Sequence, residues 1–279
     1  MCFIPTIKRL CALSGLLFLL GSCEKHELDT YDHPANVYFH LEDDADPENS
    51  RRDSIVYTFA YDMSKAQDTV FIPVRLSGVR ESRERQYRVA VEPDSSTAIA
   101  GTHYEALQPS YPLAADSGIT FLPLVVYNTA DLEENAVSLI LKLRASDDFG
   151  IENPSLIRAK VVVSAQLEQP TWWSMWLGAY SRTKHQLFLL VTEQTILSMD
   201  GLDAPKNLYF AQQLTMMLNN PFNWIQGNPE KGYVLEPVEA DNTDQYYFYH
   251  ENNPSRTILL RRNASGMYYF IDENGEEVR

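Results

Sequence analysis

The chain has 279 residues, and 23 lysines and arginines stand against 38 acidic residues, which gives a formal net charge of −15. A body this acidic lacks the basic face that nucleic-acid binding requires, so we expect no nucleic acid among its partners. The length allows one large domain or two smaller ones.

A short apolar segment follows two cations at the start of the chain. Lys8 and Arg9 precede the apolar residues 10–20, and Leu20-Gly21-Ser22-Cys23 closes the segment. This run is too short to cross a bilayer, which takes about 20 apolar residues, and its layout is that of a secretory signal. It resembles the lipobox of bacterial lipoproteins, whose cysteine is acylated and becomes the first mature residue. The resemblance predicts a signal peptide over residues 1–22 and lipidation of Cys23.

Loss of this signal would change both the charge and the cysteine content. It removes Lys8, Arg9 and no acid, so the net formal charge becomes −17. It also removes Cys2 and Cys11, and acylation would use Cys23. The folded body would then have no thiol for disulfides, thiolate catalysis or metal binding. Anionic headgroups repel such a body, so we expect the lipid anchor to hold it at the membrane.

The next part of the chain predicts a β-sandwich. Residues 23–34 are polar without a periodic apolar pattern and predict a flexible tether. Short strand-like segments then recur up to residue 167, as is typical of an antiparallel sandwich. The expected strands are 37–41, 55–61, 69–76, 86–91, 119–127, 137–143 and 159–165. Because proline gives no donor to a β-ladder, we expect Pro73 and Pro123 at sheet edges or bulges.

From residue 168 the pattern turns helical and then returns to strands. Thr171 is placed to cap a helix with Trp172, Trp176 and Tyr180 on one face. Further helices are expected at 184–197 and 207–218, and strands at 246–250, 257–262 and 267–271. We therefore predict a sandwich domain over residues 35–167 and a smaller α+β module over residues 168–279. The fold class is mainly β with a helix-plus-sheet C-terminal part.

Several motifs carry a family resemblance. Ala100-Gly101-Thr102-His103-Tyr104, the strand at 119–127 and the acidic Asp131–Glu134 resemble a Calx-beta sandwich, with His103 in place of the usual aspartate. With the lipobox, Asn128–Leu132 and the Trp172-Trp173 boundary, they resemble an uncharacterised Bacteroidota lipoprotein family, domain of unknown function 4843. The resemblance implies an accessory protein beside an outer-membrane nutrient-uptake system, lipid-anchored and exposed at the cell surface. It implies no known reaction.

The sequence carries no catalytic signature. It lacks a Gly-x-Ser-x-Gly motif, a His-Glu-x-x-His motif and a phosphate-binding glycine loop. No two of its six histidines have metal-ligand spacing, so we expect no metal and no cofactor. The Asp131–Glu134 run could supply oxygen ligands to Ca²⁺, although a solvated loop explains it more simply. The Arg80–Arg88 cluster is interleaved with glutamates, which favours a solvated hairpin over a docking patch.

Aromatic residues give the best indication of a binding surface. They are concentrated in Tyr246–Tyr249 and Met267–Phe270, on strands whose side chains alternate between two faces. Outward rings can stack on the C–H faces of sugars, whereas cross-strand aromatic pairing is the structural alternative. Trp224 lies in an expected loop. The predicted residues for binding a glycan or peptide are Trp224, Tyr247, Tyr249 and Tyr269.

Three functions follow from these observations. We favour a non-enzymatic surface lipoprotein that binds a glycan or peptide. A surface hydrolase using two cleft carboxylates is an alternative, because glycoside hydrolysis requires no sequence spacing between them. A structural or adhesive sandwich subunit is the third hypothesis.

Overall fold

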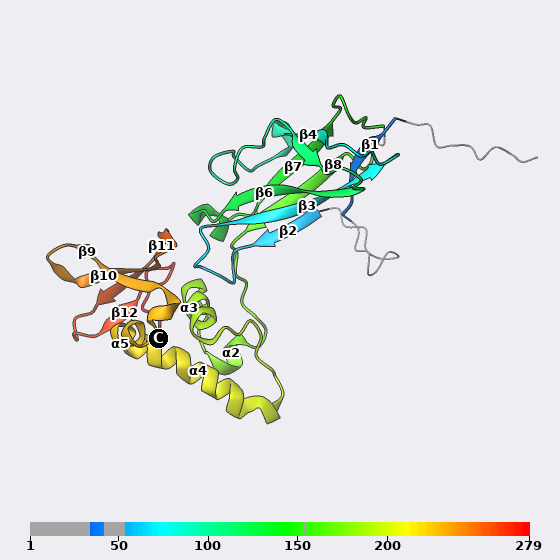
Figure 1. Cartoon of the computed structure of the whole chain (residues 1–279). Coiled ribbons are helices and arrows are strands. Elements are labelled where there is room, and N and C mark those ends of the chain that lie inside the picture. Colours follow the sequence, from blue (N-terminus) through cyan, green and yellow to red (C-terminus); the bar gives the residue numbers. More distant parts are fainter. Residues whose placement is uncertain (1–33, 42–53, 153) are drawn as a thin grey trace, which may run out of the picture. The chain divides into compact units, whose positions relative to one another are not determined.

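The computed structural model describes residues 34–41, 54–152 and 154–279 (Figure 1). The signal peptide, Cys23 and the tether up to residue 33 lie outside these residues, so all three stay predictions. Residues 35–279 form one compact unit. Within the described ranges, no helix combines the length and the apolar character needed to cross a membrane.

Two sheets form the N-terminal sandwich (Figure 1). The three-stranded sheet has the order β1-β3-β6, and the five-stranded sheet has the order β2-β8-β7-β4-β5. Strand alternation explains the layers, because Leu139, Leu141 and Leu143 of β7 are buried while the residues between them face outward. The strands are β1 (Asn36–Phe39), β2 (Ser54–Thr58), β3 (Gln67–Ser77), β4 (Arg85–Val91), β5 (Tyr111–Leu113), β6 (Ile119–Tyr127), β7 (Val137–Arg144) and β8 (Arg158–Ser164). Two 3₁₀ turns, η2 (Pro93–Ser95) and η3 (Ala130–Glu133), lie between them.

The structure confirms a mainly β sandwich and corrects its pairing. β2 runs parallel to β8, so the sandwich is not wholly antiparallel as predicted. Pro73 was expected at a sheet edge or bulge, but it lies in β3, the central strand of the three-stranded sheet. In an antiparallel ladder the nitrogen and the carbonyl of one residue face the same neighbouring strand. The Pro73 carbonyl accepts a bond from the His40 N–H (3.1 Å), so its nitrogen also faces the side of β1. Because β1 has already ended at Phe39, the missing N–H of Pro73 removes no bond of the ladder. Pro123 lies on the edge strand β6, as predicted.

Strand β1 is held on both sides. It pairs antiparallel with β3. On its other side the Val37 N–H donates to the Gly150 carbonyl (3.3 Å), and the Gly150 N–H donates to the Ala35 carbonyl (2.8 Å). The Asn36 side-chain oxygen accepts a further bond from the Glu152 N–H (3.0 Å). The first described strand of the sandwich is therefore hydrogen-bonded on both of its edges.

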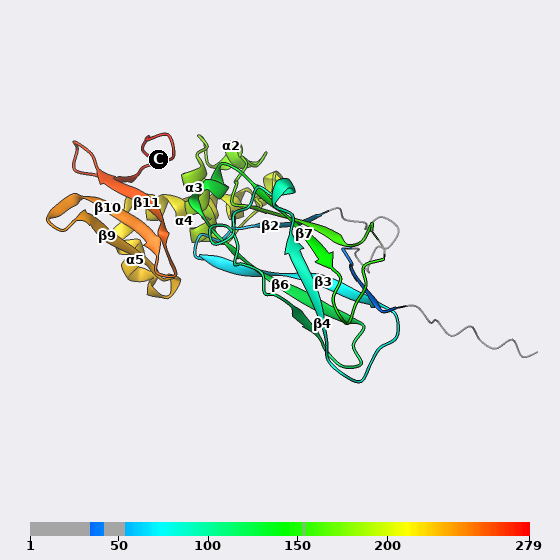
Figure 2. The ribbon, with the colours of Figure 1, turned by 90° about the horizontal axis from the view of Figure 1, so that it is seen from above.

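The C-terminal module combines four helices with a four-stranded sheet of order β12-β11-β10-β9. Helices α4 and α5 cover one face of this sheet (Figure 2). The helices are α2 (Trp173–Trp176), α3 (Arg182–Thr192), α4 (Ala204–Asn219) and α5 (Pro221–Gly227), with 3₁₀ turns η4 (Gly201–Asp203) and η5 (Pro229–Lys231). The strands are β9 (Tyr233–Glu239), β10 (Asn242–His250), β11 (Asn253–Arg262) and β12 (Tyr268–Phe270).

Two of the expected helices are shorter than predicted. The one expected after Thr171 is the single turn α2, and Thr171 does not cap it; Gly178 follows with φ at +73°. The one expected over 184–197 ends at Thr192, because Glu193 adopts the left-handed conformation with φ at +55°. Strand β9, which contains Pro237 and Glu239, was not expected, since its apolar alternation is weak.

The buried apolar residues fall into two clusters. Those of the first run from Val37 to Ala165, and those of the second run from Trp172 to Val278. Met63, in the turn between β2 and β3, is the described sandwich residue that packs against the second cluster. A domain boundary at residue 167 stays a prediction.

Candidate functional site

Three of the four predicted ligand-binding residues lie on one face of the C-terminal sheet. Tyr247 pairs with Leu259 across β10 and β11, and Tyr269 pairs with Arg261 across β11 and β12. The alternate residues of these strands are buried under the helices. Tyr249 is on the same face, where its hydroxyl donates to the Glu236 carboxylate (2.6 Å), a bond that raises the pKa of the tyrosine. This face has no helix over it, and Tyr247 is 40% exposed.

Trp224 does not join these tyrosines. The structure places it in helix α5 and not in the predicted loop. Its ring is partly buried and packs against the second apolar cluster, on the helix-covered side of the sheet. Pro221 begins this helix, where the missing N–H of a proline costs nothing.

A second candidate site is a cleft of about 430 Å³ between the β2–β3 turn and the C-terminal module. One wall is the turn, where the Tyr61 ring is 57% exposed. The opposite wall comes from α3, η5 and the β9–β10 pair. Its lining residues are Ala60, Tyr61, Asp62, Met63, Ser64, Gln186, Leu189, Leu190, Glu193, Thr195, Glu230, Lys231, Tyr233 and His250. Ligand sites are typically concave and mix apolar walls with a few polar groups, as this cleft does.

The His250 ring gives the cleft a hydrogen-bond donor. Because the Asn252 N–H donates to Nδ1 (3.0 Å), the neutral ring keeps its proton on Nε2. The ring stands edge-on to Tyr233 at 4.9 Å, and Tyr233 stacks on Phe248 at 5.0 Å. A Cβ on Gly232 would lie 2.8 Å from the His250 Nε2, and the φ of +67° also favours glycine there.

Carboxylates supply the acceptors of the cleft. Glu193 forms an ion pair with Lys231, which lowers the pKa of the carboxyl group. Glu193 is also one of two described non-glycine residues with positive φ, a conformation that persists only when the surroundings impose it. Asp62 accepts bonds from the Ser64 N–H (3.0 Å) and hydroxyl (2.5 Å). Asp62 and Glu230 form no ion pair with another described residue.

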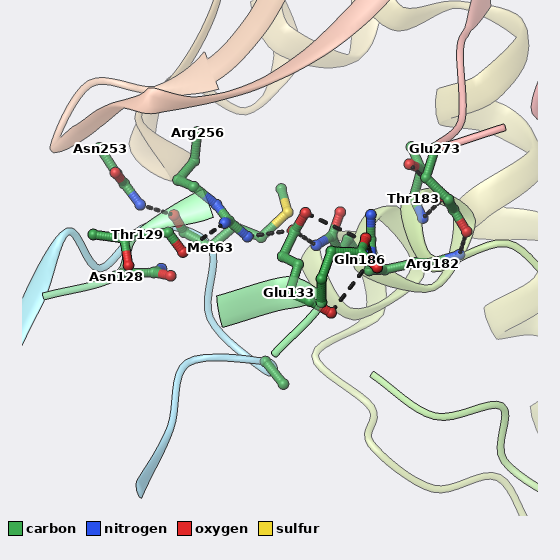
Figure 3. A network of polar contacts seen from close by, with 12 residues as sticks. Met63, Asn128, Thr129, Glu133, Arg182, Thr183, Gln186, Asn253, Arg256 and Glu273 are labelled. Atoms are coloured by element: carbon green, nitrogen blue, oxygen red, sulfur yellow. Dashed lines mark hydrogen bonds and ion pairs between the residues drawn. The ribbon is translucent and has the colours of Figure 1, made fainter. Parts of the chain in front are cut away.

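A polar network beside the cleft joins the sandwich to the C-terminal module (Figure 3). At its centre the Glu133 carboxylate accepts from the Arg256 guanidinium and from the Gln186 amide (2.6 Å), and lies 3.5 Å from Arg182. The Arg256 side chain is only 8% exposed, and burial lowers the pKa of its guanidinium. Asn253, fully buried, donates to the carbonyl of Met63 (2.9 Å).

The acidic residues Asp131–Glu134, considered above as oxygen ligands for Ca²⁺, bind other groups of the chain. Asp131 accepts from the His103 ring (2.9 Å), while Glu133 and Glu134 bind arginines of the C-terminal module. Side-chain donors of the chain itself thus engage these three carboxylates. Among the described residues, no group of three or more His, Cys, Asp or Glu side chains is arranged to hold a metal ion.

Sequence reasoning missed the cleft because its residues come from separate segments. Tyr61 ends the predicted strand 55–61, Asp62 follows it, and Glu230 lies in an unassigned stretch, so no periodic pattern links them. The one available signal was the exposed aromatic beside an acid in Tyr61-Asp62.

A family comparison covers the sandwich and the first helices. The family described as "Domain of unknown function (DUF4843)" matches residues 31–194, more than half of the chain. The chain belongs to the DUF4843 family. The match ends just after α3, so this DUF4843 protein carries α4, α5 and the four-stranded sheet beyond the matched region. No curated protein matches the chain.

Solved structures similar to this DUF4843 protein are distant. The crystal structure of CBD12 from CALX1.2 is 14% identical with a TM-score of 0.33, and covers 46% of this chain and 43% of its own. A protein of unknown function from Bacteroides ovatus is 10% identical with a TM-score of 0.37, and covers 86% of each chain. A multidomain protein including DUF1735, also from Bacteroides ovatus, is 12% identical with a TM-score of 0.30, covering 85% and 72%. The chain thus spans less than half the length of the CBD12 structure.

Proposed function

We propose that this protein is a lipid-anchored component of the outer membrane that binds a glycan at the cell surface, beside a nutrient-uptake system. The lipobox at Cys23 and the implications of the family resemblance support the location and the partner. The observation that carries ligand binding is the cleft, which places the exposed Tyr61 ring opposite hydrogen-bonding groups.

The chemistry of the cleft suits an oligosaccharide. The Tyr61 ring offers a face on which the C–H face of a sugar can stack. Asp62 and Glu230 can accept bonds from sugar hydroxyls, and the His250 Nε2–H can donate one. Three carboxylates outnumber the single lysine, and Lys231 is already paired with Glu193. A neutral polyhydroxyl ligand therefore fits better than an anionic one in this cleft.

The hydrolase alternative has less support. Glycoside hydrolysis needs one carboxyl group held protonated by a raised pKa. Glu193 has the opposite shift, since its ion pair with Lys231 lowers its pKa. The adhesive-subunit alternative needs a strand exchanged between copies, and static light scattering of the purified protein would detect the resulting polymer.

A pair of matched variants tests the proposal. The chain from residue 24 onward, which keeps the whole compact unit of residues 35–279, is applied to an array of neutral glycans and peptides. We expect Tyr61→Ala to weaken glycan binding roughly 10-fold, the value of one lost aromatic stacking contact. Tyr247→Ala removes an exposed tyrosine of the sheet face and should leave the affinity unchanged.

The two variants separate the candidate surfaces. A loss confined to Tyr247→Ala would move the site to the tyrosine face and overturn the cleft assignment. Binding of peptides and of no glycan would overturn the ligand class. Circular dichroism of both variants confirms that they are folded.

A further inference from the structure

The outer face of the five-stranded sheet carries a concentrated positive charge. Strands β8, β7 and β4 are neighbours in this sheet (Figure 1). Five cations project from them on the outer face. They are Arg88, Lys142, Arg144, Arg158 and Lys160, which we call the basic face. None of the five strands of this sheet contains an acidic residue, although the chain has 38. In a protein of net charge −15 this face is a local exception.

Cross-strand register places these cations directly opposite one another. Arg88 pairs with Arg144 across β4 and β7, and Lys142 pairs with Arg158 across β7 and β8. Like charges in directly opposed positions destabilise a sheet. Glu92 offsets the repulsion between Lys142 and Arg158. The Arg88–Arg144 pair has no such carboxylate among the described residues, which indicates a ligand that offsets its repulsion.

Among the described residues, Glu92 is the carboxylate that forms ion pairs with members of the basic face. Glu92, just after β4, binds Lys142 (3.1 Å) and Arg158 (2.9 Å). Arg88, Arg144 and Lys160 are exposed and form no ion pair with another described residue. Three guanidinium or ammonium groups are therefore available to an anionic ligand.

We propose that the basic face binds an acidic polysaccharide, a glycan with a carboxylate or sulfate on its repeating sugars. Neighbouring strands lie about 4.8 Å apart, so a chain laid across β4, β7 and β8 presents successive anions to successive cations. The face has no aromatic side chain, which a surface that docks into lipid would use as an interfacial anchor. The proposal rests on the proposed glycan-binding function and adds a second surface and a ligand class to it.

The test measures binding of the chain from residue 24 onward to polygalacturonate and chondroitin sulfate, with dextran as the neutral control. We expect the triple variant Arg88→Gln/Arg144→Gln/Lys160→Gln to bind both acidic polymers roughly 30-fold more weakly, a modest factor for each lost exposed ion pair. The matched control Arg80→Gln/Lys206→Gln/Arg262→Gln removes the same charge elsewhere and should bind as wild type does. Raising the salt concentration should weaken wild-type binding steeply.

Each other outcome overturns the proposal. Equal loss in both triple variants would mean that net charge and not the basic face governs binding. Preference for vesicles containing phosphatidylglycerol over both polymers would identify a lipid surface. Binding that appears only after the acids at 42–48 are neutralised would mean that the chain itself occupies the face. If wild type binds a neutral glycan through Tyr61 but binds neither acidic polymer, this inference alone is overturned. If wild type binds no glycan of any kind, the proposed function is overturned as well.

Discussion

The Glu133–Arg256 pair makes a strong prediction about stability. Glu133→Ala removes the carboxylate partner of Arg256, whose side chain is only 8% exposed. The guanidinium would keep the Thr129 carbonyl at 3.2 Å as an acceptor but would lose its ion-pair partner. Breaking a buried ion pair from one side costs about 3–5 kcal/mol. Because Glu133 itself is 20% exposed, we expect the lower end, about 3 kcal/mol.

Urea unfolding with two probes can measure this loss. All four tryptophans lie between residues 172 and 224, so their fluorescence reports on the C-terminal module. Far-UV circular dichroism reports on the whole chain, including the sandwich strands. In wild type the two transitions should coincide, whereas in Glu133→Ala the fluorescence transition should move to lower urea and separate from the other.

A neighbouring glutamate provides the matched control. Glu134 also binds Arg182, at 2.6 Å, but it is 66% exposed, so Glu134→Ala should cost less than about 1 kcal/mol. The double variant Glu133→Leu/Arg256→Met removes both charges and should recover most of the loss. Equal effects of Glu133→Ala and Glu134→Ala, or a loss under about 1 kcal/mol in Glu133→Ala, would refute the reasoning.

Two further predictions concern the C-terminal module. Burial lowers the pKa of His185 from 6.5 to about 4. As the pH drops, the unfolded state therefore binds a proton before the folded state does. The free energy of unfolding should fall by about 3 kcal/mol between pH 6.5 and pH 4. His185→Phe should flatten this part of a pH series of urea midpoints, whereas His250→Gln should keep it. Trp173 is fully buried, so Trp173→Ala should lower the free energy of unfolding by about 4 kcal/mol, measured by circular dichroism; a loss below about 1 kcal/mol would contradict its place in the core.

Local pattern was enough to predict the strands with a clear two-residue alternation. β6 has the bounds expected for 119–127, because buried and outward residues alternate along it. The same alternation places Tyr247 and Tyr249 on one face of β10, because they are two residues apart. Tyr269 lies on this face too, since alternation leaves each strand only two faces on which a side chain can lie.

Interactions between distant segments could not be predicted in this way. Glu133 and Arg256 are 123 residues apart in the chain, and nothing in the local sequence of either indicates the other. Helix α3 ends at Thr192 because of the backbone conformation of Glu193, which the sequence does not report. The basic face was also missed, since only the register of β4, β7 and β8 brings its five cations together.

Strand β1 is hydrogen-bonded along both of its edges, and this has a mechanical consequence. A pull on the chain ahead of Ala35 would be borne by the ladder to β3 on one side and by the bonds to Gly150 and Glu152 on the other. The load would thus enter the sandwich. The ladder of β1 would therefore be loaded before helices α2–α5 and their sheet.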